Sequence, residues 1–170
     1  DRTFLFPFFD IFASSVGEIS HPFRVSSSTI RPAFDEGWSA PRAGSLHRFA
    51  EISERAFSGT VGDAEQEDWF RENGPDVPAL IDHVRAHGAD YDLVLFWTFR
   101  YATTFFGLPH VADRAILVPT AEEDAALELS VLRDFFALPA GWLFLTPEEQ
   151  TLVGLRAGKT LEPSRVIGMG

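Results

Sequence analysis

The chain has 170 residues, of which 45% are hydrophobic and 23% are charged. This composition is typical of one soluble globular domain and excludes a disordered, collagen-like or coiled-coil protein. The formal charge of −11 disfavours broad contact with nucleic acid or with an anionic lipid surface. Because cysteine is absent, disulfides, thiolate catalysis and cysteine-ligated metals are excluded, and we expect a cytoplasmic protein.

The first 45 residues show no regular pattern, because turn-forming residues interrupt them repeatedly. We therefore predict an irregular segment of short strands and loops over residues 1–45. An apolar stretch at residues 3–13 is broken by Pro7 and Asp10, and it is far shorter than the ~20 residues that span a bilayer. It is predicted to be a core or partner-facing segment, and no transmembrane segment is expected.

Three helices are predicted in the next part of the chain. Apolar side chains recur at helical spacing over residues 47–57 and again over 65–73, where a Gly-Pro pair follows and ends the second helix. Asp76 is then the predicted N-cap of a third helix, which stops near Gly88. The apolar face of this third helix consists of Val77, Leu80, Ile81 and Val84.

Four later runs are β-compatible and mostly apolar, and the first of them is continuously apolar, as expected for a strand that is covered on both faces. They are residues 92–98, 115–119, 142–146 and 165–169, and each is separated from the next by a helical stretch. Such alternation implies right-handed crossovers and hence a parallel sheet. We therefore predict an α/β, Rossmann-like fold with a mostly parallel sheet flanked by helices, in a single domain over residues 46–170.

Two of the connecting helices begin with a capping-box pattern. Thr120 with Glu123, and Thr146 with Glu149, have the spacing in which a hydroxyl satisfies a backbone amide and a carboxylate reaches back. The helix after Thr120 is predicted to continue to residue 138. Its apolar face consists of Leu127, Val131, Phe135 and Leu138.

Open parallel sheets bind their ligands beyond the carboxyl ends of the strands. Here these ends lead into the loops at residues 98–101, 120–124 and 146–149. The carboxylates of the second loop are those of Glu122, Glu123 and Asp124. They suit acid, base or metal chemistry, although acids in the first turn of a helix also complement its dipole. Glu122 is the predicted catalytic residue.

The other two loops offer groups that could hold a phosphate or another polar ligand. Thr98, Arg100 and Tyr101 bring a hydroxyl, a guanidinium and an aromatic ring to one strand end, or they simply cover the edge of the sheet. Thr146 and Glu149 either face the same cleft or serve only as helix caps. The predicted substrate-binding residues are these five and the two acids Glu123 and Asp124.

Neither the histidines nor the short motifs of the sequence indicate a metal site or a familiar enzyme class. His83 and His87 are four residues apart on a predicted helix, a spacing that can direct two imidazoles toward one cation. Because no third ligand is evident, we interpret both as solvated side chains and predict neither a metal nor a cofactor. The sequence contains no G-x-S-x-G, Walker or GxGxxG motif, which removes the usual support for a hydrolase, an NTPase or a dinucleotide enzyme.

Several strand ends together resemble one known family. The likeness lies in DLVLFWTFRYATTFFGLP at residues 92–109, AILVPTA at 115–121 and FLTPEE at 144–149, and the closing VIGMG is similar to a strand that leads into a second domain. In this order the stretches resemble the amino-terminal domain of retaining glycosyltransferases with the two-domain GT-B fold. The resemblance covers residues 47–170 and depends on the agreement of several short motifs in order.

The resemblance implies transfer of a hexosyl group from an activated nucleotide sugar to an acceptor that this domain would hold. The donor would bind mostly to a second, Rossmann-like domain, which the 170 residues do not include; the sequence is then a fragment, the donor domain is a separate chain, or the protein has another role. The high phenylalanine content suggests apolar surface that needs covering, so self-association is a further expectation. Relatives tend to carry His near the reacting sugar in the loop after the strand that matches residues 115–121. Glu122 stands at that position here.

A second hypothesis is a noncatalytic or partner-dependent binding module with the same fold. The isolated chain is expected to have little or no transfer activity, because without a donor domain nothing orients a nucleotide sugar against the acceptor.

Overall fold

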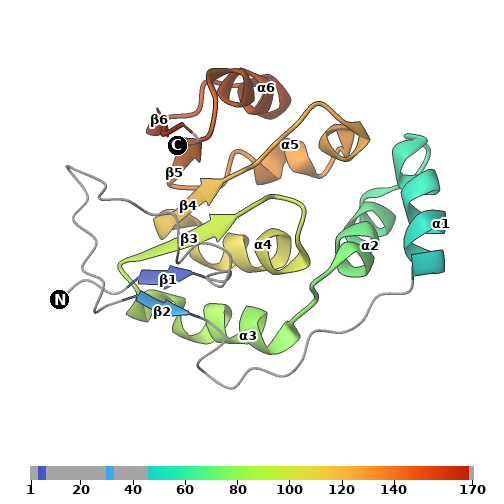
Figure 1. Ribbon diagram of the computed structural model, residues 1–170. Coiled ribbons are helices and arrows are strands. Elements are labelled where there is room, and N and C mark those ends of the chain that lie inside the picture. Colours follow the sequence, from blue (N-terminus) through green and yellow to red (C-terminus); the bar gives the residue numbers. More distant parts are fainter. Residues whose placement is uncertain (1–3, 7–29, 33–45, 169–170) are drawn as a thin grey trace.

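The computed structural model describes residues 4–6, 30–32 and 46–168, and its centre is a six-stranded parallel sheet (Figure 1). The strand order is β2-β1-β3-β4-β5-β6, and every neighbouring pair is parallel. The strands are β1 (Phe4–Phe6), β2 (Ile30–Pro32), β3 (Leu93–Trp97), β4 (Ala115–Val118), β5 (Gly141–Phe144) and β6 (Ser164–Val166).

Helices connect the strands from β2 onward. The α-helices are α1 (Leu46–Phe57), α2 (Asp63–Asn73), α3 (Pro78–His87), α4 (Ala102–Gly107), α5 (Leu132–Phe135) and α6 (Pro147–Ala157). Short 3-10 helices are η3 (Gly88–Asp90), η4 (Leu108–Arg114) and η5 (Ala125–Glu128). Figure 1 shows α1 and α2 as a helical pair on the side toward which β3 and β4 point.

The α/β, Rossmann-like fold and its parallel sheet are confirmed. Strands β3, β4, β5 and β6 fall within or next to the four predicted apolar runs, and the connections between them are helical. Side chains of β3 alternate between buried and half-buried, and three of the four in β4 are buried, which is the burial of strands covered on both faces. The segment predicted to be irregular contributes β1 and β2 to the same sheet, and its other residues lie outside the described part.

Two predicted helix starts are wrong. Asp76 does not cap α3, because Val77 is the N-cap and Pro78 occupies the first turn, where its missing N–H costs nothing. Thr120 caps no helix either, because its φ of 51° is left-handed and the chain stays non-helical as far as Asp124. Asp124 is the cap instead, and its carboxylate accepts the N–H groups of Ala126 and Leu127.

The long helix predicted after residue 120 is divided into η5 and α5. Its predicted apolar face survives the break in part, because Leu127 and Phe135 are buried and Val131 packs against the core. Leu138 lies beyond α5 and is 41% exposed. A periodic apolar pattern therefore identified the buried side chains without showing where the helix is interrupted.

Aromatic side chains form much of the core between the helices. The rings of Phe70 in α2 and Phe105 in α4 stack with centroids 3.9 Å apart, and Phe105 also stacks on Phe135 of α5. Trp69 and Phe70 are almost fully buried. The unusual phenylalanine content thus joins the α1–α2 pair to the helices that follow β3 and β4. Within the described residues, no helix is both long enough and apolar enough to cross a membrane.

Phe70→Ala should lower the free energy of unfolding by about 3–5 kcal/mol, because it leaves a cavity between α2 and α4. Urea denaturation followed by tryptophan fluorescence measures the change. Phe57→Ala is the matched control, and its effect should be clearly smaller because Phe57 is 39% exposed. Equal losses for the two variants would contradict this account of the core.

Candidate functional site

The candidate site begins where β3 and β4 end. Their pairing continues past both strands, since Thr98 N donates to Val118 O at 2.8 Å and Phe99 N donates to Pro119 O at 3.1 Å. The strand order reverses between β1 and β3, so the loop after β3 borders the switch point at which open parallel sheets usually bind ligands, and the loop after β4 lies beside it. The loops after β3 and β4 are therefore neighbours at the favoured edge of the sheet.

Charged side chains join the first two loops. The guanidinium of Arg100 forms an ion pair with the Asp124 carboxylate, and both side chains are about one-third exposed. The other carboxylate oxygen of Asp124 accepts the first amides of η5. The backbone oxygen of Arg100 accepts a hydrogen bond from Asn73 Nδ2 at 2.8 Å, so the end of α2 holds the loop from a third side.

Glu122 also lies in the field of Arg100. Partial burial lowers the pKa of the Arg100 guanidinium from its ordinary value, and the charge of Glu122 opposes that shift. Arginine remains protonated at neutral pH despite such a shift. Arg100, Glu122 and Asp124 thus form one charged group across two loops, with Glu122 exposed to solvent.

The third loop is attached through Glu149. Thr146 caps α6, because its hydroxyl accepts the N–H of Glu149 at 3.0 Å. The Glu149 carboxylate is buried and reaches two other amides: Oε1 accepts from Ala121 N at 2.9 Å, and Oε2 accepts from Leu145 N at 2.6 Å. The capping role predicted for Thr146 is confirmed, whereas Glu149 does not complete a capping box and instead connects the loops after β4 and β5.

Two threonines of these loops have left-handed backbones. Thr98 has a φ of 60° and Thr120 a φ of 51°, and they are the only non-glycine residues with positive φ in the described part of the chain. Such a conformation is unfavourable for a β-branched residue and costs about 1–3 kcal/mol each. Strain of this kind persists where surrounding contacts hold it, and it is concentrated at functional sites.

The remaining predicted site residues differ in how deeply they are buried. Tyr101 is half-buried and is the N-cap residue of α4, while Glu123 is exposed beside Glu122. Thr98 is buried, and Thr146 is exposed at the start of α6. Asn73 was not among the predicted site residues, because no local pattern distinguishes it and its contact with Arg100 spans 27 residues.

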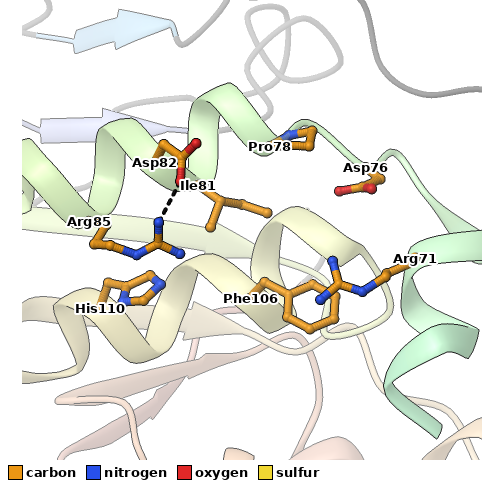
Figure 2. Close-up of a pocket in the computed structure, with 8 residues that line it drawn as sticks. All are labelled: Arg71, Asp76, Pro78, Ile81, Asp82, Arg85, Phe106 and His110. Carbon is orange, nitrogen blue, oxygen red and sulfur yellow. Dashed lines mark hydrogen bonds and ion pairs between the residues drawn. The ribbon is translucent and has the colours of Figure 1, made fainter. Parts of the chain in front are cut away.

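A separate pocket lies in the groove between α3 and the α4–η4 segment (Figure 2). Its volume is about 180 Å³, and none of the predicted site residues lines it. The lining residues are Arg71, Asp76, Pro78, Ile81, Asp82, Arg85, Phe106 and His110. In Figure 2 the side chains of Arg85 and Arg71 extend toward each other from opposite ends of the pocket. The guanidinium carbon of Arg71 lies 3.9 Å from the centroid of the Phe106 ring. Two arginines oppose two aspartates, so the formal charges cancel and select no ionic ligand.

His110 is the titratable histidine of this pocket. Partial burial lowers the pKa of its imidazole, the Arg85 guanidinium lowers it further, and the Asp82 carboxylate opposes both. Because the folded pKa lies below the unfolded value of about 6.5, acidification through that value protonates the unfolded state first. His110 therefore lowers the free energy of unfolding as the pH falls below the unfolded pKa, and it has no effect on stability well above that pKa.

NMR titration of the His110 ring should give a pKa below the ordinary histidine value. Arg85→Met should raise this pKa, because it removes a positive neighbour and releases the Asp82 carboxylate. Asp82→Asn is the matched opposite and should lower it. A wild-type pKa at or above the ordinary value, or shifts of the same sign in both variants, would contradict the assignment.

The two histidines with metal-like spacing have other partners. His83 Nε2 lies 2.8 Å from the Tyr91 hydroxyl, and His87 Nδ1 lies 3.3 Å from an Asp90 carboxylate oxygen. The imidazole centroids are 4.9 Å apart. Across residues 47–168, for which side chains are described, no three His, Asp or Glu side chains gather closely enough to hold a metal ion.

Comparisons with known proteins identify no relative of the chain. Scans against protein-family models, curated proteins and solved structures each find no match for the chain. The fold, the Arg100–Asp124 ion pair at the carboxyl edge of the sheet and the charge of Glu122 beside Arg100 are therefore the features that indicate a function.

Proposed function

We propose that the chain is the acceptor-side half of a retaining glycosyltransferase of the GT-B kind. The observation that carries the proposal is the Arg100–Asp124 ion pair, with the charge of Glu122 acting on Arg100, beside two strained threonines at the carboxyl edge of a parallel sheet. Resemblance at three strand ends supports the same reading. In this proposal the sheet edge holds a sugar acceptor, and a nucleotide sugar reaches it from a donor domain on this chain or on another.

Arg100, Tyr101 and Glu122 have distinct proposed roles. Arg100 presents a planar fork of donors, which suits acceptor oxygens, and Tyr101 offers a ring on which a sugar can pack. Glu122 accepts the proton of the acceptor hydroxyl or stabilises positive charge at the anomeric carbon. In the transfer, the acceptor oxygen bonds to the anomeric carbon while the bond from that carbon to the nucleotide phosphate breaks.

A noncatalytic binding module is the second candidate. The observation that favours it is Glu122 itself, which is exposed and stands where relatives of the proposed family tend to carry His. An ionised carboxylate cannot donate the hydrogen bond that a neutral imidazole provides. The loops would then still bind a sugar, but they would not assist bond formation.

The proposal also defines the partners and setting of the chain. It requires an acceptor, a nucleotide sugar and a donor domain, involves no nucleic acid, and places the reaction in the cytoplasm. Self-association remains a prediction that exposed apolar side chains support. The large apolar side chains described as exposed are Phe57, Leu138, Leu155 and Ile167.

Acceptor binding is tested by ¹⁵N NMR titration of the 170-residue chain with a panel of simple sugars and disaccharides. The largest shifts should fall on the loops at residues 98–101 and 120–124. Arg100→Met should weaken binding about tenfold, because a hydrogen bond to a charged donor is lost. Arg165→Met, an exposed arginine on β6, is the matched control and should leave the affinity unchanged. Shifts confined to other surfaces, or no binding, would contradict the proposal.

A measurement of sugar-transfer activity, with the chain and its donor domain both present, distinguishes the two candidate functions. Glu122→Gln should reduce turnover by about 10²–10⁴ if Glu122 acts in proton transfer, while acceptor affinity changes little. Glu128→Gln, an exposed acid of η5 outside the predicted site, is the control. Unchanged turnover in Glu122→Gln would reject the catalytic role and favour the binding module.

A further inference from the structure

Glu149 is a buried acid that belongs to two loops at once. Its side chain lies in the first turn of α6, and the residue is 5% exposed. The amide that Oε1 accepts, Ala121 N, is 28 residues earlier in the chain, and the amide that Oε2 accepts, Leu145 N, follows β5 directly. A helix cap needs neither bond, because the Thr146 hydroxyl already caps α6.

The bond to Ala121 falls directly after the strained Thr120. A β-branched residue leaves the left-handed region unless its neighbours hold it there. On the amino side, Pro119 O accepts from Phe99 N and fixes the chain to the loop after β3. On the carboxyl side, the peptide N–H of Ala121 is held by the Glu149 carboxylate. Hydrogen bonds thus fix the backbone on both sides of Thr120. On the carboxyl side, the acceptor is the side chain of Glu149 alone.

We propose that Glu149 is a positioning residue of the candidate site: its carboxylate keeps Thr120 left-handed and thereby sets the place of Glu122, two residues further on. Only the consequence for ligand binding depends on the proposed function. The role requires a carboxylate, because both oxygens accept N–H groups and the amide of glutamine offers one oxygen in their place.

Glu149→Gln keeps the shape of the side chain and removes one of the two acceptors. The amide proton of Ala121 should move upfield, because it loses a charge-assisted hydrogen bond, and sugar affinity in the NMR titration should fall about tenfold. Glu148→Gln is the matched control, since Glu148 occupies the same turn of α6 and is exposed. It should change neither the Ala121 signal nor the affinity.

Glycine at position 120 separates positioning from general destabilisation. Glycine adopts positive φ without steric cost, so Thr120→Gly should restore most of the affinity and raise the urea midpoint of the Glu149→Gln chain. Thr120→Ala in the same background should do neither, because alanine still disfavours positive φ. The comparison of the two double variants also decides the question if Glu149→Gln fails to fold by itself.

Equal behaviour of the two double variants, or an Ala121 signal that does not move in Glu149→Gln, would overturn the positioning role. A wild-type chain that binds no sugar would instead reject the proposed function. In that case the Ala121 signal and the urea midpoints still decide whether Glu149 holds Thr120, so the two failures are distinguishable.

Discussion

Backbone pairing between the loops that follow β3 and β4 is the constraint on which the rest of the site depends. The N–H groups of Thr98 and Phe99 continue the parallel ladder onto Val118, the last residue of β4, and Pro119, the residue after it. The segments that leave β3 and β4 must then turn sharply, and each turns through a left-handed threonine instead of a glycine. The energy stored there is a sizeable part of the net stability of a small domain, so other contacts must offset it.

Those contacts come from charged side chains that bridge the loops. Arg100 forms an ion pair with Asp124, and the other carboxylate oxygen of Asp124 accepts a backbone N–H at the start of η5. The buried Glu149 carboxylate accepts N–H groups from the loops after β4 and β5. Charge-assisted hydrogen bonds of this kind are stronger than neutral ones, and a buried carboxylate with both oxygens satisfied is stable where an unpaired one would not be. The same bonds give the site a fixed geometry before any ligand arrives, which reduces the entropy that binding must overcome.

The fold was predictable because its main signals are local. Strands buried on both faces read as unbroken apolar runs, and Thr146-Pro147 marks the start of α6 in the sequence itself. The candidate site was predictable as a set of loops, because parallel strands bring their carboxyl ends to one edge. The missed features depend on contacts across the fold: Thr120 is left-handed, Asp124 takes over the cap, and Glu149 turns away from its own helix toward Ala121. A capping-box pattern cannot reveal a competing amide 28 residues away.

Amide hydrogen exchange of the 170-residue chain tests most directly whether the three loops form one preorganised unit. The amides to follow are those of Thr98, Phe99, Ala121 and Leu145, each of which donates to a neighbouring strand end or to Glu149. If the loops are locked together, these four amides exchange slowly and with a common opening free energy close to that of the core strands. Fast exchange at the rates of open loops, with a different value at each position, would contradict the account.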